Sequence, residues 1–183
     1  MGAVEVVERK ELALAAEQNL DSTRQLRQPG LAQMLISILE ETGLHPDDIE
    51  LELTEGIMMG EAQASMAFLT QMHDLGVQLA MDDFGTGYSS LSYLKKMPLD
   101  RLKVDQSFVR DIVADENDAA IVRSIISLGH QFKLQVIAEG VETLEQLDFL
   151  RARGCDEIQG YYYSHPLPVE EFVMFINDNP VLD

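Results

Sequence analysis

The stretch VQLAMDDFGTGYSS, residues 77–90, joins a short apolar run to two adjacent carboxylates and a glycine-containing loop. A short apolar run such as VQLAM (77–81) is typical of a buried strand. Asp82 and Asp83 follow it directly. Because Asp and Gly are common in turns, a simple turn is one interpretation of the pair. A metal ion that neutralises both charges is the other, and the rest of the sequence decides between them.

The pattern of a strand followed by a helix recurs on both sides of this stretch. We expect strands at 49–54, 77–81, 101–104, 134–139 and 156–159. We expect helices at 30–43, from the end of the first strand to about 75, and at 90–97, 119–132, 142–154 and 169–177. This alternation predicts parallel strands joined by helical crossovers. No internal repeat or linker is evident.

Polar residues gather where the predicted strands end. They are Glu55, the pair Asp82–Asp83, Lys103 with Asp105, Glu139 and Gln159. In a barrel of parallel strands these ends form one face, and active sites lie on that face. Chance accounts for one or two such placements but not for five. The sequence therefore predicts a site on this face of an α/β barrel.

Composition limits the classes of function. A chain of 183 residues with 46% hydrophobic content can bury the core of one domain. Thirteen Lys and Arg against thirty-two Asp and Glu give a net charge of −19, which argues against DNA or RNA polymers and anionic membranes as partners. The single cysteine, Cys155, excludes an internal disulfide, and no apolar run could span a bilayer. We expect a cytoplasmic protein.

Four segments carry a family resemblance. LELTE (51–55), MDDFGTGYSSLSYLKKMPLDRLKVDQSFV (81–109), VIAEGVET (136–143) and DEIQGYYYSHPLP (156–168) resemble the EAL-domain family in order and spacing. That family comprises bacterial signalling phosphodiesterases that hydrolyse cyclic di-GMP to linear pGpG. The resemblance covers roughly residues 30–175. It implies a modified (β/α)8 TIM-type barrel, in agreement with the alternation of strands and helices.

The resemblance also implies a metal site. Carried over by position, Glu55, Asp82, Asp83 and Glu139 surround two divalent cations, with Asp82 as the bridge. Hard oxygen ligands suit Mg²⁺ or Mn²⁺. Two such cations clamp the attacking and leaving oxygens of a phosphodiester displacement and activate a water.

Four residues receive further roles from the resemblance. Lys103 would stabilise charge on the phosphate or orient the water. Glu139 would also serve as a general base, although a carboxylate that binds metal is a weaker base. Glu142 and Gln159 would hold the 83–90 loop and the water or phosphate. For Glu142, a place in the first turn of a helix, where carboxylates are favoured, is an equal alternative.

The sequence departs from the family near its start. The Glu-Ala-Leu segment that names the family, whose glutamate binds metal, is not found, and KELALAAEQ (10–18) lacks the surrounding pattern. The family's next ligand is an asparagine. QNLDSTRQLRQPG (18–30) resembles that region with one extra residue, which makes Asn19 a candidate ligand only.

Length agrees with this departure. A (β/α)8 barrel usually needs about 250 residues, so the 183-residue chain is short of one. We expect about two strands to be missing at the start. In this interpretation residues 1–29 are an atypical segment that replaces the first barrel elements, and residues 30–183 form the barrel portion. Because an open barrel exposes strand edges, we also expect a homodimer.

Two functions remain open. The first is a metal-dependent cyclic di-GMP phosphodiesterase whose activity is impaired in this chain. The second is a catalytically degenerate EAL module that acts as a cyclic di-GMP receptor or a protein-interaction domain. The intact DDFGTG loop (82–87) and Lys103 favour the first, and the missing glutamate favours the second. An unrelated lyase barrel with a carboxylate-bound metal would leave the four segments unexplained.

Overall fold

A computed structural model describes residues 30–54, 62–87 and 91–178. These residues fall into two compact units, and the division lies within the third strand, between residues 102 and 103. The first unit contains α2 (Leu31–Thr42), η1 (Pro46–Asp48), β1 (Glu50–Thr54), α3 (Ala62–Leu75), β2 (Gln78–Phe84), α4 (Leu91–Leu94) and the start of β3 (Arg101–Val104). The second contains the end of β3, α5 (Gln106–Arg110), α6 (Glu116–Gln131), β4 (Gln135–Glu139), α7 (Leu144–Arg151), β5 (Glu157–Gln159) and α8 (Val169–Asp178).

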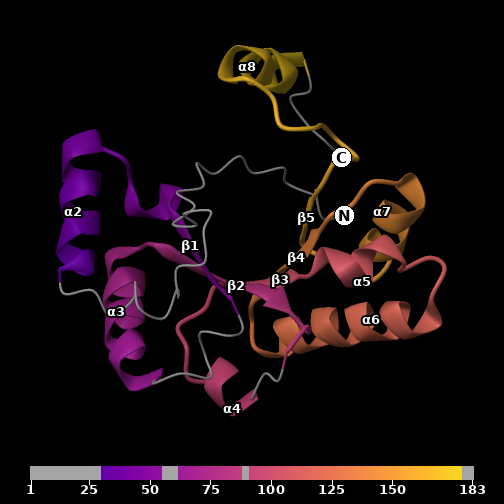
Figure 1. The fold of residues 1–183 in the computed structure, drawn as a ribbon, viewed down its shortest axis with the longest axis horizontal. Helices are drawn as coiled ribbons and strands as arrows, with labels where there is room; N and C mark the ends of the chain where they lie inside the picture. Colours follow the sequence, from indigo (N-terminus) through magenta and orange to yellow (C-terminus); the bar gives the residue numbers. More distant parts are fainter. Residues whose placement is uncertain (1–29, 55–61, 88–90, 179–183) are drawn as a thin grey trace. The chain divides into compact units, whose positions relative to one another are not determined.

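In the first unit, β1 and β2 are parallel and pair from Glu50 opposite Gln78 to Thr54 opposite Asp82. Residues 79–81 of β2 are fully buried. Helix α3 packs on β2 and α2 packs on α3, as Figure 1 shows. The buried side chains of α2 recur every four residues, which is the spacing of one helical face: Leu31, Leu35 and Leu39.

In the second unit, β4 and β5 are parallel and pair from Ile137 opposite Glu157 to Glu139 opposite Gln159. Helix α6 packs against β4 and α5 (Figure 1). The side chain of Asp115 caps the first turn of α6 by accepting the Asn117 N–H, and the apolar face of α6 is buried. Both units therefore consist of parallel strands joined by helices, as the sequence predicts.

All five predicted strands are present, with ends that differ from the prediction by at most three residues. The largest difference is in β2, which continues through both aspartates to Phe84. Two short elements escaped prediction, η1 and α5, because three and five residues are too few to show a helical period. Residues 1–29 lie outside the described part, so the predicted boundary at residue 30 stays a prediction.

A polar arrangement that we call the His–Asp clamp fixes the start of two strands. In the first unit, Asp100 immediately precedes β3. Its Oδ2 accepts the Leu79 N–H at 2.9 Å, and its own N–H donates to the Leu79 carbonyl, also at 2.9 Å. The Nε2 of His73, in the last turn of α3, lies 3.6 Å from Asp100 Oδ1. The clamp therefore joins the end of a helix, the strand after it and the strand that follows.

The second unit contains the same clamp. Asp156 immediately precedes β5, and its Oδ2 accepts the Val136 N–H at 2.8 Å. The Asp156 N–H donates to the Val136 carbonyl at 3.1 Å. His130, in the last turn of α6, places its Nε2 2.9 Å from Asp156 Oδ2. Buried backbone donors and acceptors need such partners.

None of the helices in the described ranges combines the length and the apolar character needed to cross a bilayer.

Candidate functional site

The two adjacent aspartates lie at the carboxyl end of β2, in the first unit. Asp82 and Asp83 are half-buried. The Asp83 N–H donates to Asp82 Oδ1 at 3.0 Å, and the Asp83 carbonyl accepts the hydroxyl of Thr86 at 2.9 Å. Asp83 has a φ of 54°, in the left-handed region that Asp tolerates better than most residues. The backbone therefore turns at Asp83, directly after it has brought both carboxylates to the strand end.

A buried ion pair joins the carboxyl ends of β3 and β4 in the second unit. Lys103 Nζ lies 2.6 Å from Glu139 Oε1, and the side chains are 4% and 17% exposed. A charge so far removed from water needs a partner of opposite sign. The pair fixes the Glu139 carboxylate at the strand end and places the positively charged Lys103 amine beside it.

Two further predicted residues lie close to this pair. Gln159, the last residue of β5, is opposite Glu139 in the strand register and has an exposed side chain. Its carbonyl accepts the Val141 N–H at 3.1 Å. Glu142 is also exposed, and its backbone N–H donates to the Gln146 side chain at 2.7 Å. The second unit thus brings Glu139, Gln159 and the segment that carries Glu142 to one end of its strands.

Close backbone packing holds the segments after β3, β4 and β5 together. A Cβ at Gly160 would overlap the backbone of Val141. A Cβ at Gly140, which has a φ of +70°, would lie 2.7 Å from the Cβ of Gln106 in the first turn of α5. Only glycine fits these two approaches, so the three segments cannot shift independently.

The donor chemistry of the predicted ligands fits a hard divalent cation. The side chains of Asp82, Asp83 and Glu139 offer carboxylate oxygens, which Mg²⁺ and Mn²⁺ prefer. All three are partly accessible to solvent at strand ends. The other two predicted ligands, Glu55 and Asn19, lie outside the described residues.

One residue near this end was missed by sequence reasoning. Gln146 is buried in α7 and forms a capping box with Thr143. The signal was present in TLEQ (143–146), because a Thr followed three residues later by Gln is the sequence pattern of a capping box.

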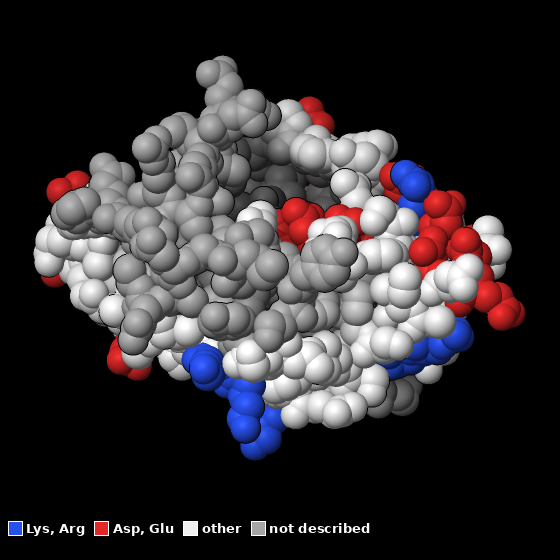
Figure 2. All heavy atoms as spheres, turned by 60° about the horizontal axis from the view of Figure 1, so that its bottom comes forward, with Lys and Arg blue, Asp and Glu red and all other residues white. Residues whose placement is uncertain are grey.

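The charge on the described surface agrees with the composition. On the face drawn in Figure 2, acidic side chains appear in several places and basic side chains gather in a few groups. A net charge of −19 repels an anionic ligand at long range. Cations bound to the carboxylates would therefore assist the binding of such a ligand.

Comparison with known proteins gives a family match and close relatives. The family model described as EAL domain matches residues 7–166. The cyclic di-GMP phosphodiesterase NbdA of Pseudomonas aeruginosa is 49% identical over 138 residues, which are 74% of this chain and 18% of NbdA. The chain spans about a fifth of the length of the curated relatives it matches.

Solved structures agree with the family match. The structure of PaMucR phosphodiesterase in a c-di-GMP complex has a TM-score of 0.78 at 41% identity, over 82% of this chain and 61% of that one. The manganese and cyclic di-GMP complex of Klebsiella pneumoniae BlrP1 has a TM-score of 0.71 at 36% identity, over 78% of this chain and 36% of that one.

Proposed function

The chain belongs to the EAL domain family, and from that premise we propose that it binds cyclic di-GMP at the carboxyl ends of its strands. Glu55, Asp82, Asp83 and Glu139 would hold two cations, Mg²⁺ or Mn²⁺, with Asp82 between them. Asn19 is the candidate for a further ligand. The relatives named as cyclic di-GMP phosphodiesterases and the complexes of similar domains with this dinucleotide support the proposal.

The observation that carries the proposal is the buried pair between Lys103 and Glu139, at 2.6 Å. A lysine that served only to cover the core would extend its amine to water. Here the amine lies at the strand ends beside a carboxylate and is 4% exposed. This placement supports a role in which Lys103 balances negative charge on a bound phosphate.

The reaction would be hydrolysis of one phosphodiester bond of the ring, which gives linear pGpG. Bound cations would supply Lewis-acid polarisation of the phosphate and a water of lowered pKa. Lys103 would stabilise the developing negative charge or orient the water. Glu139 would bind a cation and accept a proton. Glu142 and Gln159 would position the 83–90 loop and the water or phosphate.

We expect the 183-residue chain, assayed by itself, to hydrolyse cyclic di-GMP weakly or not at all. The glutamate of the Glu-Ala-Leu segment is not found in these residues, and the loss of one hard ligand unbalances a two-metal clamp. The assay is incubation with cyclic di-GMP and Mn²⁺ or Mg²⁺, followed by separation of pGpG. Robust turnover would show that another residue, either Asn19 or Glu11 of KELALAAEQ (10–18), has replaced the missing ligand.

The missing glutamate also favours a second candidate, a receptor that binds cyclic di-GMP without cleaving it. Calorimetric titration with the dinucleotide in Ca²⁺ measures binding, and the incubation with Mn²⁺ or Mg²⁺ measures formation of pGpG. Binding without pGpG supports the receptor, and binding with pGpG supports the phosphodiesterase. No binding at all contradicts both. We place the protein in the cytoplasm, with neither a membrane nor a DNA or RNA polymer as partner.

A further inference from the structure

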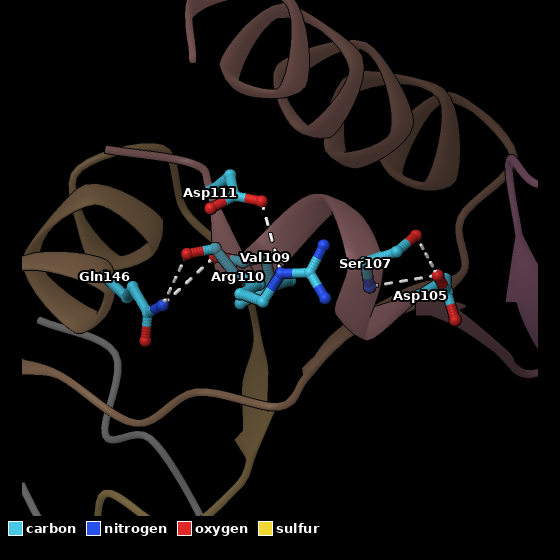
Figure 3. Close-up of polar contacts among 6 residues, drawn as sticks. All are labelled: Asp105, Ser107, Val109, Arg110, Asp111 and Gln146. Carbon is cyan, nitrogen blue, oxygen red and sulfur yellow. Dashed lines mark hydrogen bonds and ion pairs between the residues drawn. The ribbon is translucent and has the colours of Figure 1, made fainter. Parts of the chain in front are cut away.

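The buried side chain of Gln146 bridges two segments of the second unit. Its Oε1 accepts the backbone N–H groups of Glu142 and Thr143, at 2.7 and 3.0 Å. Its Nε2 donates to the backbone carbonyls of Val109 and Arg110, both at 3.2 Å. Figure 3 shows the carboxamide reaching from α7 to the end of α5. Two donated and two accepted bonds use the whole capacity of a carboxamide.

The two bridged segments are those that follow the Lys103–Glu139 pair. Helix α5 begins directly after Asp105, two residues beyond Lys103. Residues 140–143 follow Glu139 directly and include Glu142. These segments already touch, since a Cβ at Gly140 would lie 2.7 Å from Gln106 Cβ. Gly140 therefore contacts the first turn of α5, and the Gln146 bridge joins the same two segments at the last residues of α5.

We propose that Gln146 is a positioning residue, which holds the segments after β3 and β4 in the register that the Lys103–Glu139 pair and Glu142 require. The proposal rests on the proposed function for the roles of those three residues. Small displacements of reacting groups reduce rates steeply, by about 100-fold for 1 Å. A bridge that is 6% exposed and made to backbone atoms on both sides is suited to prevent them.

A purely structural role is the alternative, because Gln146 also caps α7. Two variants separate the roles. Gln146→Glu keeps an oxygen acceptor for the Glu142 and Thr143 N–H groups, and Glu is as suitable as Gln in a capping box. It offers no N–H to the Val109 and Arg110 carbonyls, so the bridge opens. Thr143→Ala removes the hydroxyl that accepts the Gln146 N–H at 3.2 Å, and leaves the bridge intact.

The full chain and both variants would be compared by amide hydrogen exchange at 106–111 and 139–143, by Mn²⁺ titration and by turnover. We expect Gln146→Glu to speed exchange at 106–111, where the bridge is lost, and to weaken Mn²⁺ binding by roughly 10- to 100-fold, the range for residues that orient metal ligands. Where turnover is measurable, kcat should fall by a similar factor with little change in KM. Thr143→Ala should leave Mn²⁺ binding and kcat within about twofold, although it lowers the unfolding temperature.

Hydrogen exchange needs neither metal nor substrate. It therefore tests the Gln146 bridge even if the chain fails to bind cyclic di-GMP. Unchanged exchange at 106–111 in Gln146→Glu would overturn the proposal. A loss of Mn²⁺ binding in Thr143→Ala without a comparable loss in Gln146→Glu would also overturn it, because it would show that the cap alone matters.

Discussion

At the scale of single residues, charge is the main determinant of the candidate site. Asp82 and Asp83 are adjacent and half-buried, and two like charges at one strand end repel each other. Glu139 has Lys103 as a partner of opposite sign. The proposed cations would further offset the repulsion between the two aspartates.

Replacement of Asp82 by Ala tests this compensation. We expect the variant to lose Mn²⁺ binding by more than roughly 100-fold, beyond the range for residues that only orient ligands. Asp74→Ala, which removes an exposed carboxylate from α3, is the matched control and should bind as the unaltered chain does. Isothermal titration with Mn²⁺ gives both values. Equal binding by all three proteins would refute the assignment of Asp82.

Cys155 gives a prediction about pH. Burial, with the nearby Asp156 charge as a smaller cause, raises the pKa of its thiol from 9.0 to about 12. Between these pH values the unfolded chain releases a proton that the folded chain keeps, so the free energy of unfolding should fall as pH rises above about 9. Urea unfolding at pH 8 and pH 10 measures this fall. A Cys155→Ala variant should lack this part of it.

The same burial predicts that iodoacetamide at pH 8 leaves the folded thiol unmodified and alkylates it in urea. Rapid alkylation of the folded chain would contradict the burial of Cys155.

The residue types at strand ends could be predicted from the sequence, because a polar residue at the end of an apolar run is recognised from its neighbours along the chain alone. Lys103, Glu139 and Gln159 lie where the strand prediction put them, whereas Asp82 and Asp83, predicted to follow their strand, lie within its last three residues. The Lys103–Glu139 contact could not be predicted, since it joins residues 36 positions apart. The Gln146 bridge was missed for the same reason, since its partners Val109 and Arg110 lie on another helix.

At the scale of elements, the His–Asp clamps fix how neighbouring strands begin. We expect Asp156→Ala and Asp100→Ala each to lower the free energy of unfolding by about 1–3 kcal/mol, because each leaves a strand N–H without a partner. Urea unfolding followed by circular dichroism measures the loss. Asp111→Ala removes an exposed carboxylate and should change stability by less than about 0.5 kcal/mol. A loss as small as this in both clamp variants would contradict the role of the clamps.

Long elements with a clear hydrophobic period were predicted well, and short or polar-ended ones were not. Helix α6 was expected at 119–132 and runs from Glu116 to Gln131, because its first turn is polar and carries no apolar signal. Strand β2 extends past its apolar run because backbone pairing with β1 continues to Asp82 whatever the side chain. Strands pair through backbone hydrogen bonds, so the apolar side chains that indicate a strand do not fix where its pairing ends.

At the scale of the whole molecule, the family match and the similar structures confirm the predicted α/β fold class of the barrel type. The assembly of the chain stays a prediction. Five strands lie in the described ranges, whereas a closed barrel of this type has eight. We expect a two-fold dimer in which residues 1–30 contribute to the contact or fill the gap.

Light scattering after size exclusion would test the dimer over a dilution series. The expected mass is twice that of one chain. A well-folded monomer at the lowest concentration would contradict the prediction, and would mean that residues 1–29 close the barrel within the chain.

The two clamps also have a bearing on ancestry. His73 and His130 are 57 positions apart, as are Leu79 and Val136, and Asp100 and Asp156 are 56 apart. The same offsets relate proposed site residues: Asp82 to Glu139 by 57, and Lys103 to Gln159 by 56. Duplication of one strand–helix–strand segment would leave this pattern, which becomes evident as a repeat only through the clamp contacts and not from the sequence alone. In that history Asp82 and Glu139 descend from one residue, and Lys103 and Gln159 descend from another that has since diverged.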